Sequence, residues 1–110
     1  MIEKTVLDYL NENLDVNAYM EIPENIETSF VLIEKTSGSR TNEINNAMIA
    51  IQSYGATLYE AAQLNETVKE LMYKLPETED VGRCHLNTDY NFTDSQTKRY
   101  RYQSVWEIYY

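Results

Sequence analysis

Three sets of residues in this chain have the chemical types that catalysis or ligand binding requires. Cys84 and His85 are adjacent and combine a nucleophile with a base. Segment 34–46, EKTSGSRTNEINN, contains the Gly, Ser and Arg that a phosphate-binding loop uses. Carboxylates form the third set, because 18 acidic side chains outnumber 9 basic ones. Each set must be positioned by the elements around it before it can act.

The segment 34–46 does not have the spacing of a phosphate-binding loop. Such loops use repeated glycines, so that backbone amides can turn toward the phosphates, followed by Lys-Ser or Lys-Thr and a helix. Gly38 stands alone here, no such lysine pair follows, and the next segment has the apolar pattern of a strand. We therefore predict a long polar loop at about 34–46, disordered in the isolated chain.

Cys84 and His85 do not form a catalytic dyad on a strand, because neighbouring side chains there point to opposite faces. The chain has one Cys and one His, too few ligands for a typical zinc site. The acidic residues Glu60, Glu66 and Glu70 lie off the apolar stripe of a predicted helix and indicate a solvated face. These patterns predict no catalytic residues, no metal, no cofactor and no enzyme.

The elements that position these residues follow from the hydrophobic pattern. Amphipathic repeats predict helices at 1–14 and 56–75, the second with Thr57 and Glu60 at capping-box spacing. Apolar or alternating runs predict strands at 18–22, 29–35, 47–54, 83–92 and 99–109. We expect a single α+β domain over 1–110, in the order α-β-β-β-α-β-β. Its two helices should pack on a mostly antiparallel sheet of about five strands.

Side-chain spacing predicts which residues are buried. The expected stripe of the second helix is Leu58, Ala61, Leu64, Val68, Leu71 and Leu75. In the last strand one face should hold Tyr100, Tyr102, Ser104, Trp106 and Ile108, and the other Arg101, Gln103, Val105, Glu107 and Tyr109. Ten tyrosines are more than such a core needs, so they indicate either a Tyr-rich core with wet edges or an interface.

The net charge of −9 argues against binding to nucleic acid or to anionic lipid. Lys98, Arg99 and Arg101 form the best basic cluster, and in the predicted strand Arg99 and Arg101 share one face while Lys98 points to the other. We interpret this cluster as a solvated strand face. No run approaches about 18 apolar residues, so we expect no membrane-spanning helix.

Several stretches resemble the small tail-terminator proteins of long-tailed bacteriophages that infect Gram-positive bacteria, which are also called tail-completion or minor capsid proteins. The similarity covers about residues 29–110. Its most recognisable parts are IEKTSG (33–38), IQSYG (51–55) followed by LYEAAQLNETVK (58–69), and RYRYQ (99–103). The resemblance implies an α+β structural protein with no catalytic activity and no cofactor.

That family resemblance also implies location and partners. The protein would form a ring, hexameric in the virion and monomeric when isolated, that caps the tail tube and joins it to the head-completion proteins. It would be present in the host cytoplasm during assembly, and DNA would pass through the ring without specific binding. The interface residues we expect are Ser37, Ser39, Arg40, Asn42, Glu43, Tyr100, Tyr102 and Tyr109. The alternatives are a head-completion protein on the portal side, and a small acidic adaptor or inhibitor of a host protein.

Overall fold

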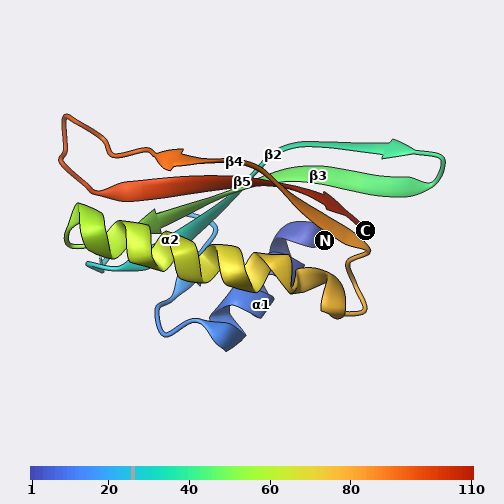
Figure 1. Ribbon diagram of the computed structural model, residues 1–110, viewed down its shortest axis with the longest axis horizontal. Helices are drawn as coiled ribbons and strands as arrows, with labels where there is room; N and C mark the ends of the chain where they lie inside the picture. Colours follow the sequence, from blue (N-terminus) through green and yellow to red (C-terminus); the bar gives the residue numbers. More distant parts are fainter. Residues whose placement is uncertain (26) are drawn as a thin grey trace.

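The fold has two layers, with two helices on one face of a five-stranded sheet (Figure 1). The computed structural model describes residues 1–25 and 27–110. The elements are α1 (Ile2–Asn13), β1 (Ala18–Tyr19), β2 (Phe30–Thr41), β3 (Ile44–Tyr54), α2 (Leu58–Tyr73), the 3-10 turn η1 (Leu75–Glu77), β4 (Arg83–Asn91) and β5 (Arg101–Tyr109). Strand β1 pairs with β2 in parallel, and the sheet order β1-β2-β3-β5-β4 is otherwise antiparallel. The predicted α+β fold and element order are confirmed.

Both helices form where apolar residues recur on one side. In α1, Ile2, Val6 and Leu10 repeat every four residues and are buried against the sheet. Helix α2 begins after Thr57, whose side chain accepts a hydrogen bond from the Glu60 amide at 3.1 Å, as the capping-box spacing predicts. No helix in the described residues combines the length and apolar character that crossing a membrane requires.

The buried stripe of α2 differs from the predicted one. Its buried residues are Ala61, Asn65, Val68 and Met72. The predicted Leu58 is 38% exposed. The stripe is turned by about one residue because a polar side chain, Asn65, lies at its centre and is only 1% exposed. A prediction based on apolar residues alone could not include an asparagine.

Asn65 is buried because β4 supplies a partner for its amide group. Its Nδ2 donates to Asp89 Oδ1 at 2.6 Å. The other carboxylate oxygen of Asp89 forms an ion pair with Lys69 Nζ, also at 2.6 Å. Glu66 lies 2.9 Å from the same ammonium group. The hydrogen bond to Asp89, and after it the one to Glu66, raises the pKa of Lys69. The cluster joins α2 to the outer strand of the sheet.

The hydrophobic core lies between the helices and the sheet face beneath them. The sheet contributes Val31, Ile33, Ala47, Ile49, Ile51, Trp106 and Ile108. Trp106 is fully buried at the centre, where its indole N–H donates to Ser104 Oγ at 2.8 Å and the Tyr73 ring meets it edge-on at 5.1 Å. Pairing of Ile49 with Trp106 in the β3–β5 register places both side chains on this face.

Gly55 links β3 to α2 at a place with no room for a side chain. A Cβ atom there would lie 2.5 Å from the Ala61 amide nitrogen and 2.9 Å from the Glu60 carbonyl carbon. We expect Gly55→Ala to lower the free energy of unfolding by about 1–3 kcal/mol, because the clash is with backbone that must shift. Urea denaturation measures this. Gly82→Ala is the matched control, because its nearest contact is at 3.6 Å; an equal loss in both variants would contradict the explanation.

Candidate interaction surfaces

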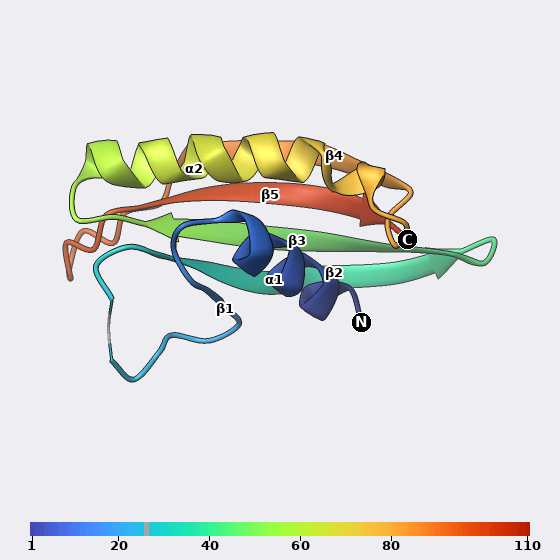
Figure 2. The same cartoon turned by 90° about the horizontal axis from the view of Figure 1, so that it is seen from below.

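The first candidate surface is the ribbon, which we define as residues 34–46 at the connected ends of β2 and β3. It extends beyond both helices along the longest dimension of the molecule (Figure 2), which measures 43 Å against 26 and 25 Å for the other two. Every residue from Glu34 to Ile44 is exposed, and Ile44 keeps 55% of its surface in solvent. Ser37, Ser39, Arg40, Asn42 and Glu43, all predicted interface residues, lie on the ribbon.

The predicted polar loop at 34–46 is wrong, because this segment is paired strand with a two-residue turn. Pairing runs from Ser37 opposite Met48 to Thr41 opposite Ile44. Asn42 and Glu43 form the turn with φ angles of 51° and 65°, the left-handed values that a tight hairpin of right-handed twist requires. The polar composition of the segment led to the wrong prediction. A ribbon with solvent on both faces can form without the alternation of apolar and polar residues that usually indicates a strand.

The ribbon borders a groove of about 670 Å³ at the edge where β5 ends. The groove is lined by Thr41, Asn42, Glu43, Ile44, Asn46, Glu79, Asp80, Gly82, Arg83, Tyr109 and Tyr110. Tyr110 fixes the ribbon to the body, because its backbone exchanges two hydrogen bonds with Asn45, at 2.9 and 3.2 Å. The structure thus brings Tyr109 to the ribbon, whereas Tyr100 and Tyr102 lie at the opposite end of β5.

The second candidate surface is the open face, the side of the sheet that carries neither α1 nor α2 (Figure 1). The strand registers place on it Phe30, Leu32, Glu34, Met48, Ala50, Gln52, Tyr54, Arg83, His85, Thr88, Tyr90, Arg101, Gln103, Val105, Glu107 and Tyr109. The predicted division of β5 into two faces is confirmed, with Tyr102 toward the helices and Tyr109 on the open face. Leu32, Met48 and Val105 are half-buried there.

Side-chain hydrogen bonds connect the centre of the open face into one network. Gln52 Nε2 donates to Gln103 Oε1 at 3.0 Å, and Gln103 in turn donates to the Tyr90 hydroxyl. The Tyr54 hydroxyl donates to Gln52 Oε1 at 3.1 Å and accepts from Arg101 Nη1 at 2.8 Å. The network satisfies polar groups that are largely buried, since Gln52, Tyr54 and Gln103 are each at most 8% exposed, and it holds them at fixed positions.

Arginine side chains on this side stack against aromatic rings. Arg101 Cζ lies 4.4 Å from the Phe92 ring centre and 5.7 Å from that of Tyr54, and its Nε donates to the Phe92 carbonyl at 2.7 Å. Arg99 lies over the same Tyr54 ring at 5.1 Å. Tyr54 is itself stacked on Phe30 at 4.4 Å. These contacts hold the guanidinium groups at defined positions.

The expectation for the basic cluster therefore needs a correction. Strand β5 begins at Arg101 rather than at residue 99, and Lys98 has a left-handed φ of 57°, so the residues before Arg101 do not alternate as a strand. Arg99 and Arg101 are nevertheless brought together, because both approach Tyr54 of β3. Their spacing predicted a shared side, but it could not reveal that Tyr54 of β3 lies next to both, because that neighbour comes from strand pairing distant in sequence.

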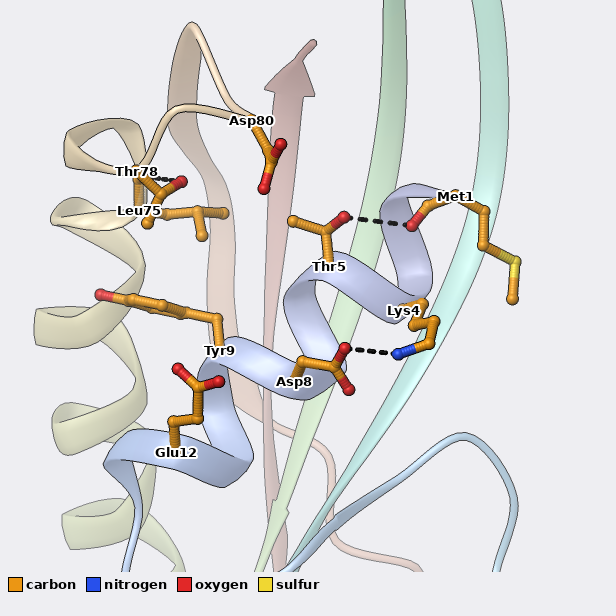
Figure 3. A pocket seen from close by; sticks show the side chains of 9 residues that line it. All are labelled: Met1, Lys4, Thr5, Asp8, Tyr9, Glu12, Leu75, Thr78 and Asp80. Atoms are coloured by element: carbon orange, nitrogen blue, oxygen red, sulfur yellow. Dashed lines mark hydrogen bonds and ion pairs between the residues drawn. The ribbon is translucent and has the colours of Figure 1, made fainter.

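A second groove, of about 330 Å³, lies on the helical side, between α1 and the turn after η1 (Figure 3). Lys4 and Asp8 form an ion pair of 2.6 Å along its rim. Tyr9 points away from α1 toward α2 and donates to the Leu71 carbonyl at 2.7 Å. Asp8, Glu12 and Asp80 give this groove an acidic lining. Among the described residues, no three His, Cys, Asp or Glu side chains are grouped to hold a metal ion.

Cys84 and His85 are separated as the strand geometry predicts. Cys84 faces the core opposite Ile108, and His85 lies opposite Glu107 on the open face. Burial raises the pKa of the Cys84 thiol to about 12, so the thiolate form needed for nucleophilic attack is scarce at neutral pH.

No protein-family model and no curated protein matches this chain.

Alkaline pH should destabilise this protein through Cys84 and Tyr9. Burial raises the pKa of both groups in the folded state, so the folded chain keeps protons that the unfolded chain releases. The contribution of these groups to the free energy of unfolding is then fully present below about pH 9 and is lost as the pH rises toward 12. For Cys84 the loss is at most about 1.4 kcal/mol per pH unit. Urea unfolding between pH 7 and 11 measures the slope. Cys84→Ala should make it shallower, and an unchanged slope would contradict the prediction.

Proposed function

We propose that this chain is a structural protein of a bacteriophage virion, which assembles as a closed ring on the end of the tail tube and joins the tail to the head connector. The site of action is the head–tail junction, after assembly in the host cytoplasm. The proposal combines the resemblance over residues 29–110 with the two candidate surfaces described above.

The observation that carries the proposal is the exposed ribbon. A protruding two-stranded ribbon is marginally stable by itself, because it orders many residues and buries little apolar surface. The chain nevertheless extends β2 and β3 well past the helices and exposes every side chain from Glu34 to Ile44. A ribbon of this shape is suited to lying across a neighbouring subunit, which would supply the missing contacts.

The layered body supports a ring rather than a symmetric pair. A ring needs two different surfaces on each subunit, so that contact passes from one subunit to the next and closes. The open face and the helical side differ in both composition and shape, and the ribbon reaches beyond them along the long axis. The net charge of −9 suits a conduit through which DNA slides, since it repels phosphate.

The site chemistry also favours a structural role over catalysis. Cys84 and His85 face opposite sides of the sheet, and among the described residues neither groove is lined by Cys, Ser or His. The polar network of the open face consists of amides, tyrosines and Arg101, which are groups that bind and orient.

Sedimentation velocity over a range of concentrations, with and without the tail-tube protein of a suitable phage, tests this proposal. We expect a monomer at low concentration that converts to rings with a central hole in negative-stain images when tube ends are present. Pull-down should recover tail-tube protein.

Two other outcomes would contradict the tail-tube assignment. Recovery of portal components alone would favour the head-completion alternative. A monomer that binds neither partner at any concentration would refute the structural proposal as a whole.

A further inference from the structure

Three arginine side chains on the sheet side of the molecule lack a carboxylate partner. Within residues 1–25 and 27–110, the ion pairs involve Lys4 and Lys69 and no arginine. Arg83 lies 5.3 Å from the Tyr109 ring centre, and Arg99 and Arg101 lie over Tyr54. The aromatic rings orient these guanidinium groups, and Arg83 also donates to His85 Nε2 at 3.1 Å. Arg101 lies close enough to Asp94 for their charges to interact, so Arg83 and Arg99 are the two whose positive charge remains most available to a partner.

The opposite side of the molecule carries the excess of negative charge. The helical segments 2–15 and 58–80 contain ten acidic and three basic residues, a net charge of −7 out of the total of −9. Two of the three basic residues, Lys4 and Lys69, are already paired within the chain. The two layers of one subunit therefore have complementary electrostatic character.

The outer side of α2 combines this charge with aromatic surface. Glu66 and Glu70 are one helical turn apart and exposed, opposite the buried Ala61, Asn65, Val68 and Met72. Tyr59 continues the same side of the helix and is 71% exposed. Exposed aromatic residues such as Tyr59 are enriched on surfaces that bind another protein, and the carboxylates beside it give this side of α2 a negative charge.

We propose that a second copy of this chain packs the outer side of its α2 helix on the open face of the first, with carboxylates of α2 facing Arg83, Arg99 and Arg101. The inference rests on the proposed ring and names its subunit interface. Because the two surfaces differ, each subunit uses one on either side and the contact propagates head to tail. Half-buried Leu32, Met48 and Val105 supply the apolar floor that charge alone would not.

Single-stranded nucleic acid is the competing occupant, because arginines and aromatic rings on an open sheet also bind bases and phosphates. The total charge disfavours it, since the acidic helical layer is part of the same small body and repels a polyanion. A second copy brings its own carboxylates to the arginines and relieves the charge imbalance of both surfaces.

A charge exchange between the two surfaces tests the inference. The sheet variant is Arg83→Glu with Arg99→Glu; Arg101 is kept because it bonds to Tyr54 and to the Phe92 carbonyl. The helix variant is Glu66→Lys with Glu70→Lys. Each variant alone would place like charges across every contact, so we expect its self-association to weaken at least about tenfold. An equal mixture should recover association, because alternating subunits restore opposite charges at both contacts.

The control for the helix variant is Glu21→Lys with Glu24→Lys, which makes the same change in net charge on an exposed segment outside both surfaces. Thermal unfolding of all variants establishes that they are folded, and sedimentation at low salt with tube ends present measures association. If wild type forms rings and both variants do so equally well, this interface is wrong and the ring proposal stands. If wild type forms no assembly, both are wrong.

Binding of single-stranded DNA to wild type, lost in the sheet variant without any change in self-association, would assign the open face to nucleic acid and overturn the inference.

Discussion

Replacing residues 40–45 with Asn-Gly should leave the body folded and abolish the joining of tails to heads that we propose for this protein. The change removes the tip of the ribbon and keeps Ser39 opposite Asn46 as the last pair, closed by a two-residue turn of the type that Asn-Gly favours. No core residue is deleted, because the side chains removed are exposed or half-buried. The loss should appear in assembly because the proposed contact with a neighbouring subunit is gone.

Complementation of a phage that lacks this gene measures the effect, with electron microscopy of the tails and thermal unfolding of the purified variant. We expect tails that fail to join heads and an unfolding temperature within a few degrees of wild type. Arg40→Glu is a more conservative variant, because it keeps the length of the ribbon and reverses the charge of the only basic residue in segment 40–45. Normal yields of infectious particles from the shortened variant would show that the ribbon has no role in joining.

Trp106→Ala should cause the largest loss of stability of any single substitution considered for this chain. Trp106 is fully buried, donates a hydrogen bond to Ser104 Oγ and packs against Tyr73 and Ile49. Truncation of a buried Trp costs about 3–5 kcal/mol through lost apolar burial and the cavity that remains. The total free energy of unfolding of a small domain is about 5–15 kcal/mol, so this single substitution should remove a large fraction of the stability.

Urea denaturation followed by far-ultraviolet circular dichroism measures this loss, since the substitution removes the tryptophan fluorescence. Trp106→Phe is the matched control. It keeps an aromatic ring beside Tyr73 and gives up the indole N–H, so it should cost clearly less. Equal losses for Phe and Ala would mean that the hydrogen bond to Ser104, rather than packing, dominates at this position.

Local patterns were enough to predict most of the fold. The four-residue spacing of Ile2, Val6 and Leu10 predicts α1, and the capping-box spacing at Thr57 predicts the start of α2. The prediction for the buried stripe of α2 was wrong because its deciding contact lies far away in the sequence. Asn65 is buried because Asp89 accepts its hydrogen bond across 24 residues, and nothing near Asn65 indicates that partner.

The candidate surfaces were predicted only in part, for a similar reason. The strand spacing of β5 correctly separates Arg101 and Gln103 from Trp106. It does not reveal that β3 lies alongside and provides Gln52 and Tyr54 to complete the network. The available signal was that Gln52 and Tyr54 are two residues apart in an otherwise mostly apolar strand, which places two groups able to form hydrogen bonds on the same face.

The narrow turn at Asn42 and Glu43 has a consequence for how proteins of this shape can diverge. Each residue added to both strands would lengthen the ribbon by about 3.4 Å, and additions in pairs would keep every side chain on its original face. Neither the core nor the helices would need to change. The length of the ribbon is therefore encoded separately from the stability of the body. In the ring that we propose, the insertion of a few polar residues could fit one body to rings of different diameter.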